Sequence, residues 1–493
     1  MLTIQEIKTL IENDASSKKK QFARVGQRYY EADHDIKNYR IFFFDADGNL
    51  KEDKTKSNIK ICHPFFTENV DQTVQYLLSG EGGFVKSDNP ELQAELDAYF
   101  NENEDFMTEL DDVITGAVAK GFENMYAYKT TEDRTAFSCA DSLGVVEVKA
   151  KETDDGCEYV IFHYIDSISK DGKKVRRIQV WDEKQTTFFC QVDDGRITLD
   201  ESEKINPKPH IMWQNEGDEA TYFEGYGFIP FFRFDNNKKQ FSGLKPIKDL
   251  IDDYDLMSCG LSNNIQDTNE ALYVVKGFSG DNLDELMVNI KNKKHIGVDE
   301  DGDVEIRTID IPYQARQTKL ALDEKNIYRF GMALNTAGLR DTNATTNLAI
   351  QTAYSLLDLK CSKLKNRLKQ FMRKLLKVVL KEINDRKGTA YEQKDVYFVF
   401  ETDIPTNTQE NAQVKLTEAQ RKQTEITTLL NVASYLDNET LMQLICEQLD
   451  VDYNEIKDKL PTQDDGTDPY AAQSALDAIQ PEDNPDPGGG VIE

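Results

Sequence analysis

Two helices of matched length, with a small insertion between them, constrain the fold of this chain more than any other sequence feature. Residues 247–268 carry apolar side chains at helical spacing, and Pro246 suits the first turn of a helix. A second helix begins at Pro312 and continues to about Leu334. At 1.5 Å per residue, each helix spans roughly 33 Å. The pair therefore predicts a stalk of two helices that carries a compact head.

The head and the segment after the stalk differ in composition. The head is predicted as the strand ALYVVKG, the helix DNLDELMVNIKN and the hairpin HIGVDEDGDVEIRTI. After the second helix comes a loop, 336–347, rich in Thr and Asn, and then a long helix over about 348–386. Residues 351–387 hold eleven basic and three acidic side chains. This basic helix could bind DNA, and it could equally contact acidic surface on its own chain or on a neighbour.

The remaining segments predict helices around a block of strands, so we expect an α+β fold that is mainly helical. Between Met125 and Phe234, short apolar runs separated by Asp, Gly and Asn predict a mostly antiparallel sheet. Residues 461–493 contain eight acidic residues, no basic residue and five prolines, which predicts a disordered tail. The other predicted elements are helices over 3–30, 66–79, 90–100 and 104–120, strands at 41–44, 57–61 and 395–401, and two or three helices within 410–460.

Length and charge narrow the function classes. A chain of 493 residues is too long for one compact core, so several domains are expected. Its apolar fraction of 39% and mean hydropathy of −0.61 suit an elongated subunit that buries surface against neighbours. Proteins that grip DNA gain affinity by neutralising phosphates, so a net charge of −30 argues against tight DNA binding. The charge fits a protein past which DNA slides, and it also fits an acidic protein with no link to DNA.

Two kinds of glycine-containing loop resemble ligand sites only superficially. In GEGGFVKS (80–87), Val85 stands where a phosphate-binding loop needs glycine before its lysine, so a surface loop is predicted. The segments DADGN (45–49) and DEDGD (299–303) lack the later Glu that completes a calcium loop. Because each lies between strand-like segments, a hairpin turn is predicted for both.

No pattern predicts catalysis, a cofactor or a metal. The seven cysteines contain no CxxC pair, the five histidines show no close pairing, and no GxSxG occurs. Acidic pairs such as Asp252 and Asp253 are expected on solvated helical surface. We therefore expect a protein that is not an enzyme. No run approaches about 18 apolar residues, and the N-terminus lacks an apolar leader, so no membrane association is expected.

Several short blocks occur in order along residues 25–460. The blocks are Tyr29, Tyr30 and Glu31 with Asp35 and Ile36; Asn58, Lys60 and Ile61; Phe65 and Phe66; Val70 and Asp71; Tyr76 to Gly80; Gly121, Phe122 and Glu123 with Tyr126, Ala127 and Tyr128; Ile229, Pro230 and Phe231 with Phe234, Asn236 and Asn237; Ile251 to Asp255; and Val274 to Gly277. Together and in this order, they resemble the portal family of tailed phages, in particular siphophages of Gram-positive hosts. After the second helix, the sequence TTNLAI (345–350) departs from the SGxALK of the family.

This resemblance implies a subunit with wing, stem, clip and crown regions in a ring that is expected to be a dodecamer. The implied regions are 1–243 as wing, 244–270 as first stem helix, 271–311 as clip, 312–335 as second stem helix, 336–350 as tunnel loop, 351–409 as basic helix and wing strand, 410–460 as crown and 461–493 as tail.

The implied role is mechanical: the ring is the DNA channel at one capsid vertex, used for genome packaging, head–tail connection and DNA ejection. The implied partners are further copies of the chain, double-stranded DNA bound without sequence preference, the packaging ATPase (large terminase), a head-completion adaptor and the major capsid protein. The protein is expected in the virion and, during assembly, in the host cytoplasm. The residues expected to line the channel are Arg340, Asp341, Thr342, Asn343, Thr345 and Thr346. The residues expected to dock partners at the clip are Asp299, Glu300, Asp301 and Asp303.

Two other functions stay open on the sequence alone. If the chain is a phage nuclease or transferase, the purified protein should show metal-dependent turnover. If it is a capsid-associated scaffold, it should assemble without a channel.

Overall fold

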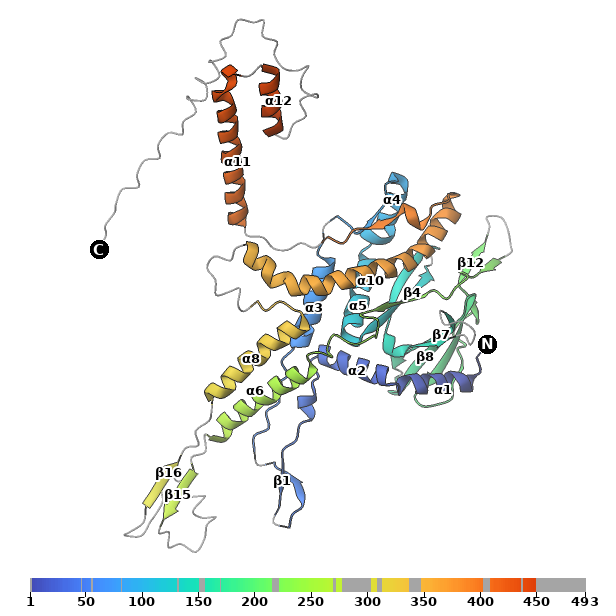
Figure 1. The fold of residues 1–493 in the computed structure, drawn as a ribbon. Helices are drawn as coiled ribbons and strands as arrows, with labels where there is room; N and C mark the ends of the chain where they lie inside the picture. Colours follow the sequence, from blue (N-terminus) through green and yellow to red (C-terminus); the bar gives the residue numbers. More distant parts are fainter. Residues whose placement is uncertain are drawn as a thin grey trace, which may run out of the picture. The chain divides into compact units, whose positions relative to one another are not determined.

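The structure of the chain is a computed structural model in which two compact units are distinguished, residues 1–405 and 406–493. It describes residues 2–45, 47–54, 56–80, 82–130, 133–149, 156–168, 170–214, 221–268, 272–276, 303–307, 313–336, 347–401, 408–435 and 438–448. The first unit is a mixed α+β structure, as expected (Figure 1). The predictions for the tail and for the helix at 281–292 lie outside the described residues.

The predicted helix over 3–30 is wrong in one respect, because the structure contains two helices there. Helix α1 spans Ile4–Ala15 and α2 spans Lys18–Tyr30. The hydroxyl of Ser17 accepts a hydrogen bond from the Lys20 amide and so caps α2. Periodicity alone continues through this break because the apolar side chains keep their spacing on both sides.

Helices α3, α5 and α10 form the main core of the first unit. The predicted side chains Leu364, Leu368, Phe371, Leu375 and Val379 of the basic helix are all buried in it. Burying a side chain of this size stabilises the fold by about 1.5–3 kcal/mol each. The helices of this region are α3 (Phe65–Leu78), α4 (Pro90–Leu96) with a π-helical turn (Asp97–Asn101), α5 (Glu104–Lys120) and α10 (Asn347–Lys387).

The antiparallel pairing predicted between Met125 and Phe234 is confirmed, but the strands form separate sheets and not one sheet. One sheet has the order β10-β9-β8-β7-β6, with β11 also pairing with β9; another has the order β14-β4-β5; and β12 pairs with β13. The strands are β4 (Phe122–Lys129), β5 (Thr135–Ala140), β6 (Val145–Lys149), β7 (Cys157–Ile168), β8 (Lys174–Trp181), β9 (Gln185–Val192), β10 (Thr198–Leu199), β11 (Lys208–Pro209), β12 (Ile211–Gln214), β13 (Thr221–Glu224) and β14 (Phe231–Asp235).

The larger sheet packs apolar side chains on both of its faces, because successive side chains along each strand point to opposite faces. Ile161 and Ile178 pack with Ile7 of α1 on one face. Val160 and Phe162 face the other way, toward the β14-β4-β5 sheet. Since side chains alternate along a strand, one apolar run supplies two buried layers.

The DADGN hairpin is confirmed, but the strand predicted to follow it is wrong. Strand β1 (Phe42–Phe44) pairs with β2 (Leu50–Glu52), and the amide of Asp45 donates to the carbonyl of Asn49 at 3.0 Å. Residues 57–61 form no strand and instead contact a helix, as described below.

The two matched helices are confirmed, with ends within a few residues of those expected. Helix α6 spans Lys248–Thr268 and α8 spans Tyr313–Gly331. Between them, β15 (Leu272–Lys276) pairs antiparallel with β16 (Asp303–Arg307). The predicted strand at 395–401 is shorter, since β17 (Tyr397–Phe398) pairs with β3 (Val85–Lys86).

The second unit, described by itself, contains α11 (Thr408–Asn431) and α12 (Asn438–Gln448), in agreement with helices predicted within 410–460. Among the described residues, no helix combines the length and the apolar character needed to cross a membrane.

Candidate functional site

The helices α6 and α8 lie side by side and share a charged contact (Figure 1). The Lys319 ammonium on α8 bonds the carboxylates of Asp253 on α6 and Asp323 on α8. Asp323 is only 2% exposed, so this lysine is what compensates its charge in a nearly dry position. Asp253 lies on helical surface as expected, with its side chain 39% exposed, and there it makes this pair.

The C-terminal end of α8 is fixed to α3 through its backbone. The Gln72 amide nitrogen donates to the Leu334 carbonyl at 3.0 Å, and the Leu334 amide donates to the Gln72 side-chain oxygen at 2.9 Å. One turn earlier on α3, Asn69 donates to the Gly331 carbonyl at 3.0 Å. A Cβ at Gly331 would lie 2.1 Å from the Asn69 nitrogen, so the contact requires glycine there.

Helix α10 reaches the same point through one lysine. Lys360 donates to the Gly331 carbonyl at 3.3 Å and also bonds the Asn69 side-chain oxygen. Desolvation lowers the pKa of Lys360 to about 8. Helices α3, α8 and α10 therefore meet at Gly331, the last residue of α8, which precedes the predicted channel loop in the sequence.

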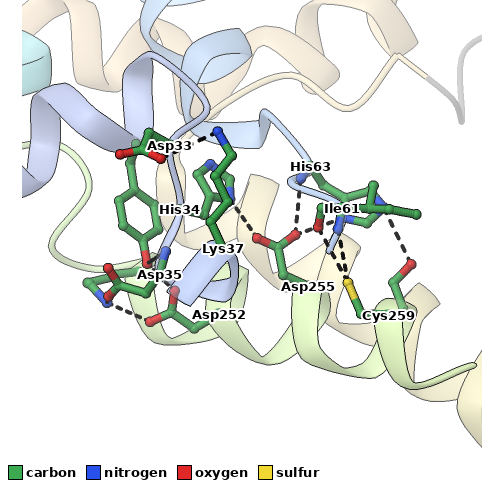
Figure 2. A network of polar contacts seen from close by, with 12 residues as sticks. Asp33, His34, Asp35, Lys37, Ile61, His63, Asp252, Asp255 and Cys259 are labelled. Carbon is green, nitrogen blue, oxygen red and sulfur yellow. Dashed lines mark hydrogen bonds and ion pairs between the residues drawn. The ribbon is translucent and has the colours of Figure 1, made fainter. Parts of the chain in front are cut away.

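The N-terminal end of α6 is held by a second polar group (Figure 2). The Lys248 ammonium lies 2.7 Å from Asp35 and 2.6 Å from Asp252, and the Tyr29 hydroxyl donates to Asp252. Burial and the hydrogen bond to Asp252 raise the pKa of Tyr29. Asp252 is thus tied to α2 and to the turn after it.

One turn further along α6, Asp255 joins two histidines that are distant in sequence (Figure 2). Its carboxylate lies 2.6 Å from His34 Nδ1 and 2.7 Å from His63 Nδ1. Burial opposes its ionisation, yet hydrogen bonds from His34 and His63 hold the pKa of Asp255 below its usual value. Among the described residues, His34, Cys62 and Asp255 form the group whose ligand atoms could share a metal ion.

The backbone of residues 57–63 is bound along α6 by a ladder of side chains. The amide of His63 donates to Asp255 at 3.0 Å and that of Ile61 to Cys259 Sγ at 3.2 Å. The amides of Ile59 and Ser57 continue the ladder, to Asn263 at 2.7 Å and to Asp267 at 3.1 Å. Every fourth residue of a helix is about 6 Å further along its axis, and every second residue of an extended chain is about 6.6 Å further along. The acceptors on α6 therefore match the spacing of alternate amides in 57–63. A strand-like sequence thereby satisfies its amides on a helix.

The positively charged side chains near the end of α10 contact acids of their own chain. Lys381 pairs with Glu224 at 2.8 Å, and Lys387 pairs with Glu95 at 2.8 Å, where Arg386 also binds. Three of the eleven basic side chains in 351–387 thus contact acidic surface of their own chain, one of the two uses predicted for this helix.

The predicted site residues stand mostly outside the described part of the chain. All six channel-loop residues, Arg340 to Thr346, lie there, as do Asp299, Glu300 and Asp301. Asp303 is described as the first residue of β16, opposite Lys276 of β15. The glycine-rich loop is described in part: Lys86 donates to the carbonyl of Gly82 and lies in β3, a use of the lysine that suits a structural loop.

Sequence reasoning did not identify the contacts among His34, His63 and Asp255. No spacing signal joins them, because 221 positions separate Asp255 from His34 and 192 separate it from His63. The resemblance marked the stretches near Asp35, Ile61 and Ile251 to Asp255, which is where these contacts form, but it assigned them no chemistry.

Comparison with known proteins decides the family. A family described as "Phage portal protein, SPP1 Gp6-like" matches residues 10–456. The chain belongs to this family. It is 27% identical over 351 residues to the portal protein of Bacillus phage SPP1, across 71% of this chain and 67% of that protein. It is 23% identical over 390 residues to the portal protein of a Clostridium phage, phiCD119, across 77% of this chain and 82% of that protein.

The resemblance to portal proteins of phages of Gram-positive hosts is thus confirmed. Portal proteins serve DNA packaging at the capsid vertex, where they are part of the virion, and their role is structural. In a portal subunit, the anchored end of α8 and the polar groups along α6 are the joints that hold a helix pair to the body of the chain.

Proposed function

We propose that copies of this portal chain, twelve in number, close into a ring whose central channel passes double-stranded DNA during packaging and ejection. The observation that carries the proposal is the joint at Gly331. There the backbone of α8 is fixed to α3 and α10 immediately before residues 337–346. A loop that touches moving DNA needs ends that do not move. Hydrogen bonds from α3 and α10 hold the backbone in place just before this loop begins.

In this proposal the regions follow the family plan. Residues 1–243 and 351–409 form the wing, α6 and α8 the stem, 271–311 the clip, 336–350 the tunnel loop and 410–460 the crown. The stem helices present charges to one another through Lys319 and Asp253, so they can act as one rigid strut. In the tunnel loop, which also contains Asp341, the side chains of Thr342, Asn343, Thr345 and Thr346 touch the DNA backbone weakly, and Arg340 supplies one cation per subunit.

The clip is proposed to bind the packaging ATPase during filling and the head-completion adaptor afterwards. In the sequence, the clip falls between the two stem helices. It carries the acidic residues Asp299, Glu300, Asp301 and Asp303. The wing is proposed to contact the major capsid protein. If the channel wall shares the negative sign of the overall charge of −30, it repels phosphates, and DNA then avoids being trapped in the channel.

Electron microscopy of the purified full chain, with mass measurement in solution, tests the proposal. We expect closed rings with a central opening and a mass of twelve chains. Monomers at micromolar concentration together with no ring in virions would refute it. Closed assemblies without an opening would favour a scaffold, and metal-dependent turnover of nucleic acid would favour an enzyme.

A further inference from the structure

Three potential metal ligands from three separate segments meet beside α6. His34 follows α2, Cys62 lies in the segment bound along α6, and Asp255 lies on α6 itself. We propose that these three residues bind one divalent transition-metal cation, with Zn²⁺ as the best chemical match.

The distances are close to those of a bound site. One ligand atom from each residue lies within 4.8 Å of the other two. In a tetrahedral zinc site, with bonds of about 2.0–2.3 Å, the ligand atoms are about 3.3–3.8 Å apart. Completing the site therefore takes two adjustments. The widest pair moves inward by about 1 Å, which a side-chain rotation of Cys62 can supply, and His34 Nδ1 and Asp255, which lie 2.6 Å apart, move apart by about 1 Å.

The buried histidine presents one ring nitrogen to the site. His34 is 0% exposed, and its Nδ1 lies 2.6 Å from the Asp255 carboxylate. Its ring is fixed by stacking on Tyr29, with centroids 4.5 Å apart. Because Nδ1 faces Asp255, it is the imidazole nitrogen placed to bind a cation that Asp255 also binds.

The chemistry of the ligands selects the class of cation. Thiolate, imidazole and carboxylate together are the ligands of zinc and its neighbours, whereas Ca²⁺ and Mg²⁺ prefer oxygen alone. Two groups of His63 also hold Asp255, its backbone amide at 3.0 Å and its Nδ1 at 2.7 Å. An outer partner of this kind orients a ligating carboxylate.

The position gives the cation a structural task. It joins the turn after α2 and the segment at 57–63 to the helix α6, in addition to the hydrogen bonds that already do so. Cys62 is half-buried, so an ion can enter from its side. The inference concerns a joint within one chain and does not depend on the ring or on the passage of DNA.

Cobalt titration of the purified, reduced full chain is the test, because Co²⁺ occupies zinc sites and is coloured. We expect about one equivalent of Co²⁺ per chain, a thiolate-to-cobalt charge-transfer band, intense tetrahedral visible bands, and displacement of all three signals by Zn²⁺. Cys62→Ser should abolish the charge-transfer band, and His34→Gln or Asp255→Asn should weaken binding by at least about tenfold. Cys190→Ser, at a half-buried cysteine of β9, is the matched control and should leave the spectrum unchanged.

Two results would overturn the site. One is a wild-type chain that binds neither Co²⁺ nor Zn²⁺ at micromolar concentration. The other is a folded Cys62→Ser variant, judged by circular dichroism, that keeps the charge-transfer band, because the thiolate then comes from another cysteine. Zinc should also raise the melting temperature of the wild type and of Cys190→Ser, and leave that of Cys62→Ser nearly unchanged.

Discussion

The side chain of Gln72 makes two hydrogen bonds to the backbone of Leu334, one as donor at 3.0 Å and one as acceptor at 2.9 Å. An amide side chain that pairs with both polar groups of one residue fixes that residue as a neighbouring strand would. Because Leu334 lies just beyond α8, this pair sets where the chain leaves the helix.

Replacing Gln72 by alanine should loosen the chain after α8 without unfolding the body. Two hydrogen bonds at about 0.5–1.5 kcal/mol each predict a loss of about 1–3 kcal/mol locally. Hydrogen exchange followed by mass spectrometry should show faster exchange of the Leu334 amide. Gln75→Ala, at an exposed position of the same helix, is the control and should leave the exchange unchanged. Equal protection of Leu334 in both variants would contradict the proposed clamp.

Replacing Lys319 by alanine should destabilise the helix pair, because it strands the buried Asp323 carboxylate. The expected loss in the free energy of unfolding is about 1–3 kcal/mol, moderated because the Lys319 side chain is 37% exposed. Adding Asp323→Asn should recover part of it, since the stranded charge is then gone. Denaturant unfolding measures both variants against Lys325→Ala, an exposed lysine on the same helix. A loss no larger than that of Lys325→Ala would exclude this role.

Acid should weaken the first unit through His210. Burial lowers the pKa of His210 to about 4, whereas an unfolded histidine has a pKa near 6.5. Below about pH 6.5 the unfolded state takes up a proton that the folded state refuses, so stability falls as pH drops from 6.5 to 4.

His210→Phe should therefore reduce this acid loss by about 3 kcal/mol. Phenylalanine keeps a ring next to Trp181 and Tyr226, whose ring centroids lie 5.3 and 5.9 Å from that of His210. The measurement is the free energy of unfolding at several pH values for both proteins. Burial also lowers the pKa of His163 to about 4. Because both proteins contain His163, its contribution cancels in the difference between their free energies of unfolding. Parallel pH curves would show that His210 is not the group that titrates.

Arg340→Glu should leave rings intact and impair packaging or retention of DNA. A solvated pair of this arginine with phosphate contributes about 1 kcal/mol or less, so DNA still slides in the wild type. Reversing the charge repels phosphate at every subunit. The measurement is the amount and length of DNA held by phage that carries the variant. Lys8→Glu, an exposed lysine on α1, is the control, and normal full-length packaging by Arg340→Glu would rule out the contact.

Neutralising Asp299, Glu300, Asp301 and Asp303 to their amides should weaken binding of the packaging ATPase or the adaptor while rings still form. The reason is that charged groups on a docking surface set its complementarity and its rate of encounter. Pull-down with each partner measures the effect. Neutralising the exposed Asp194 and Glu201 is the comparison. If both partners bind the clip variant at wild-type strength, the docking surface lies elsewhere.

The segment 57–63 shows where pattern reading succeeds and where it stops. A strand was predicted over 57–61, and the backbone of the segment is indeed extended along a repeating set of hydrogen-bond acceptors. Those acceptors belong to side chains of α6, from Asp255 to Asp267, and not to another strand. A local pattern specifies that amides need partners every second residue, and it cannot say which element provides them.

The sequence by itself determined the elements that depend on local periodicity, including α6, α8 and α10, the hairpin at Asp45, and the order of blocks that marks the portal family. The tertiary structure alone decided the joints: Gln72 with Leu334, Lys319 with Asp323, and His34 with Asp255. The physical reason is the sequence distance over which each kind of interaction acts. The spacing of apolar residues that defines a helix or strand involves only residues within one or two turns of one another. A hydrogen bond between residues 221 positions apart exists only after packing has brought two elements together, and packing also fixes which polar groups are buried and must be satisfied.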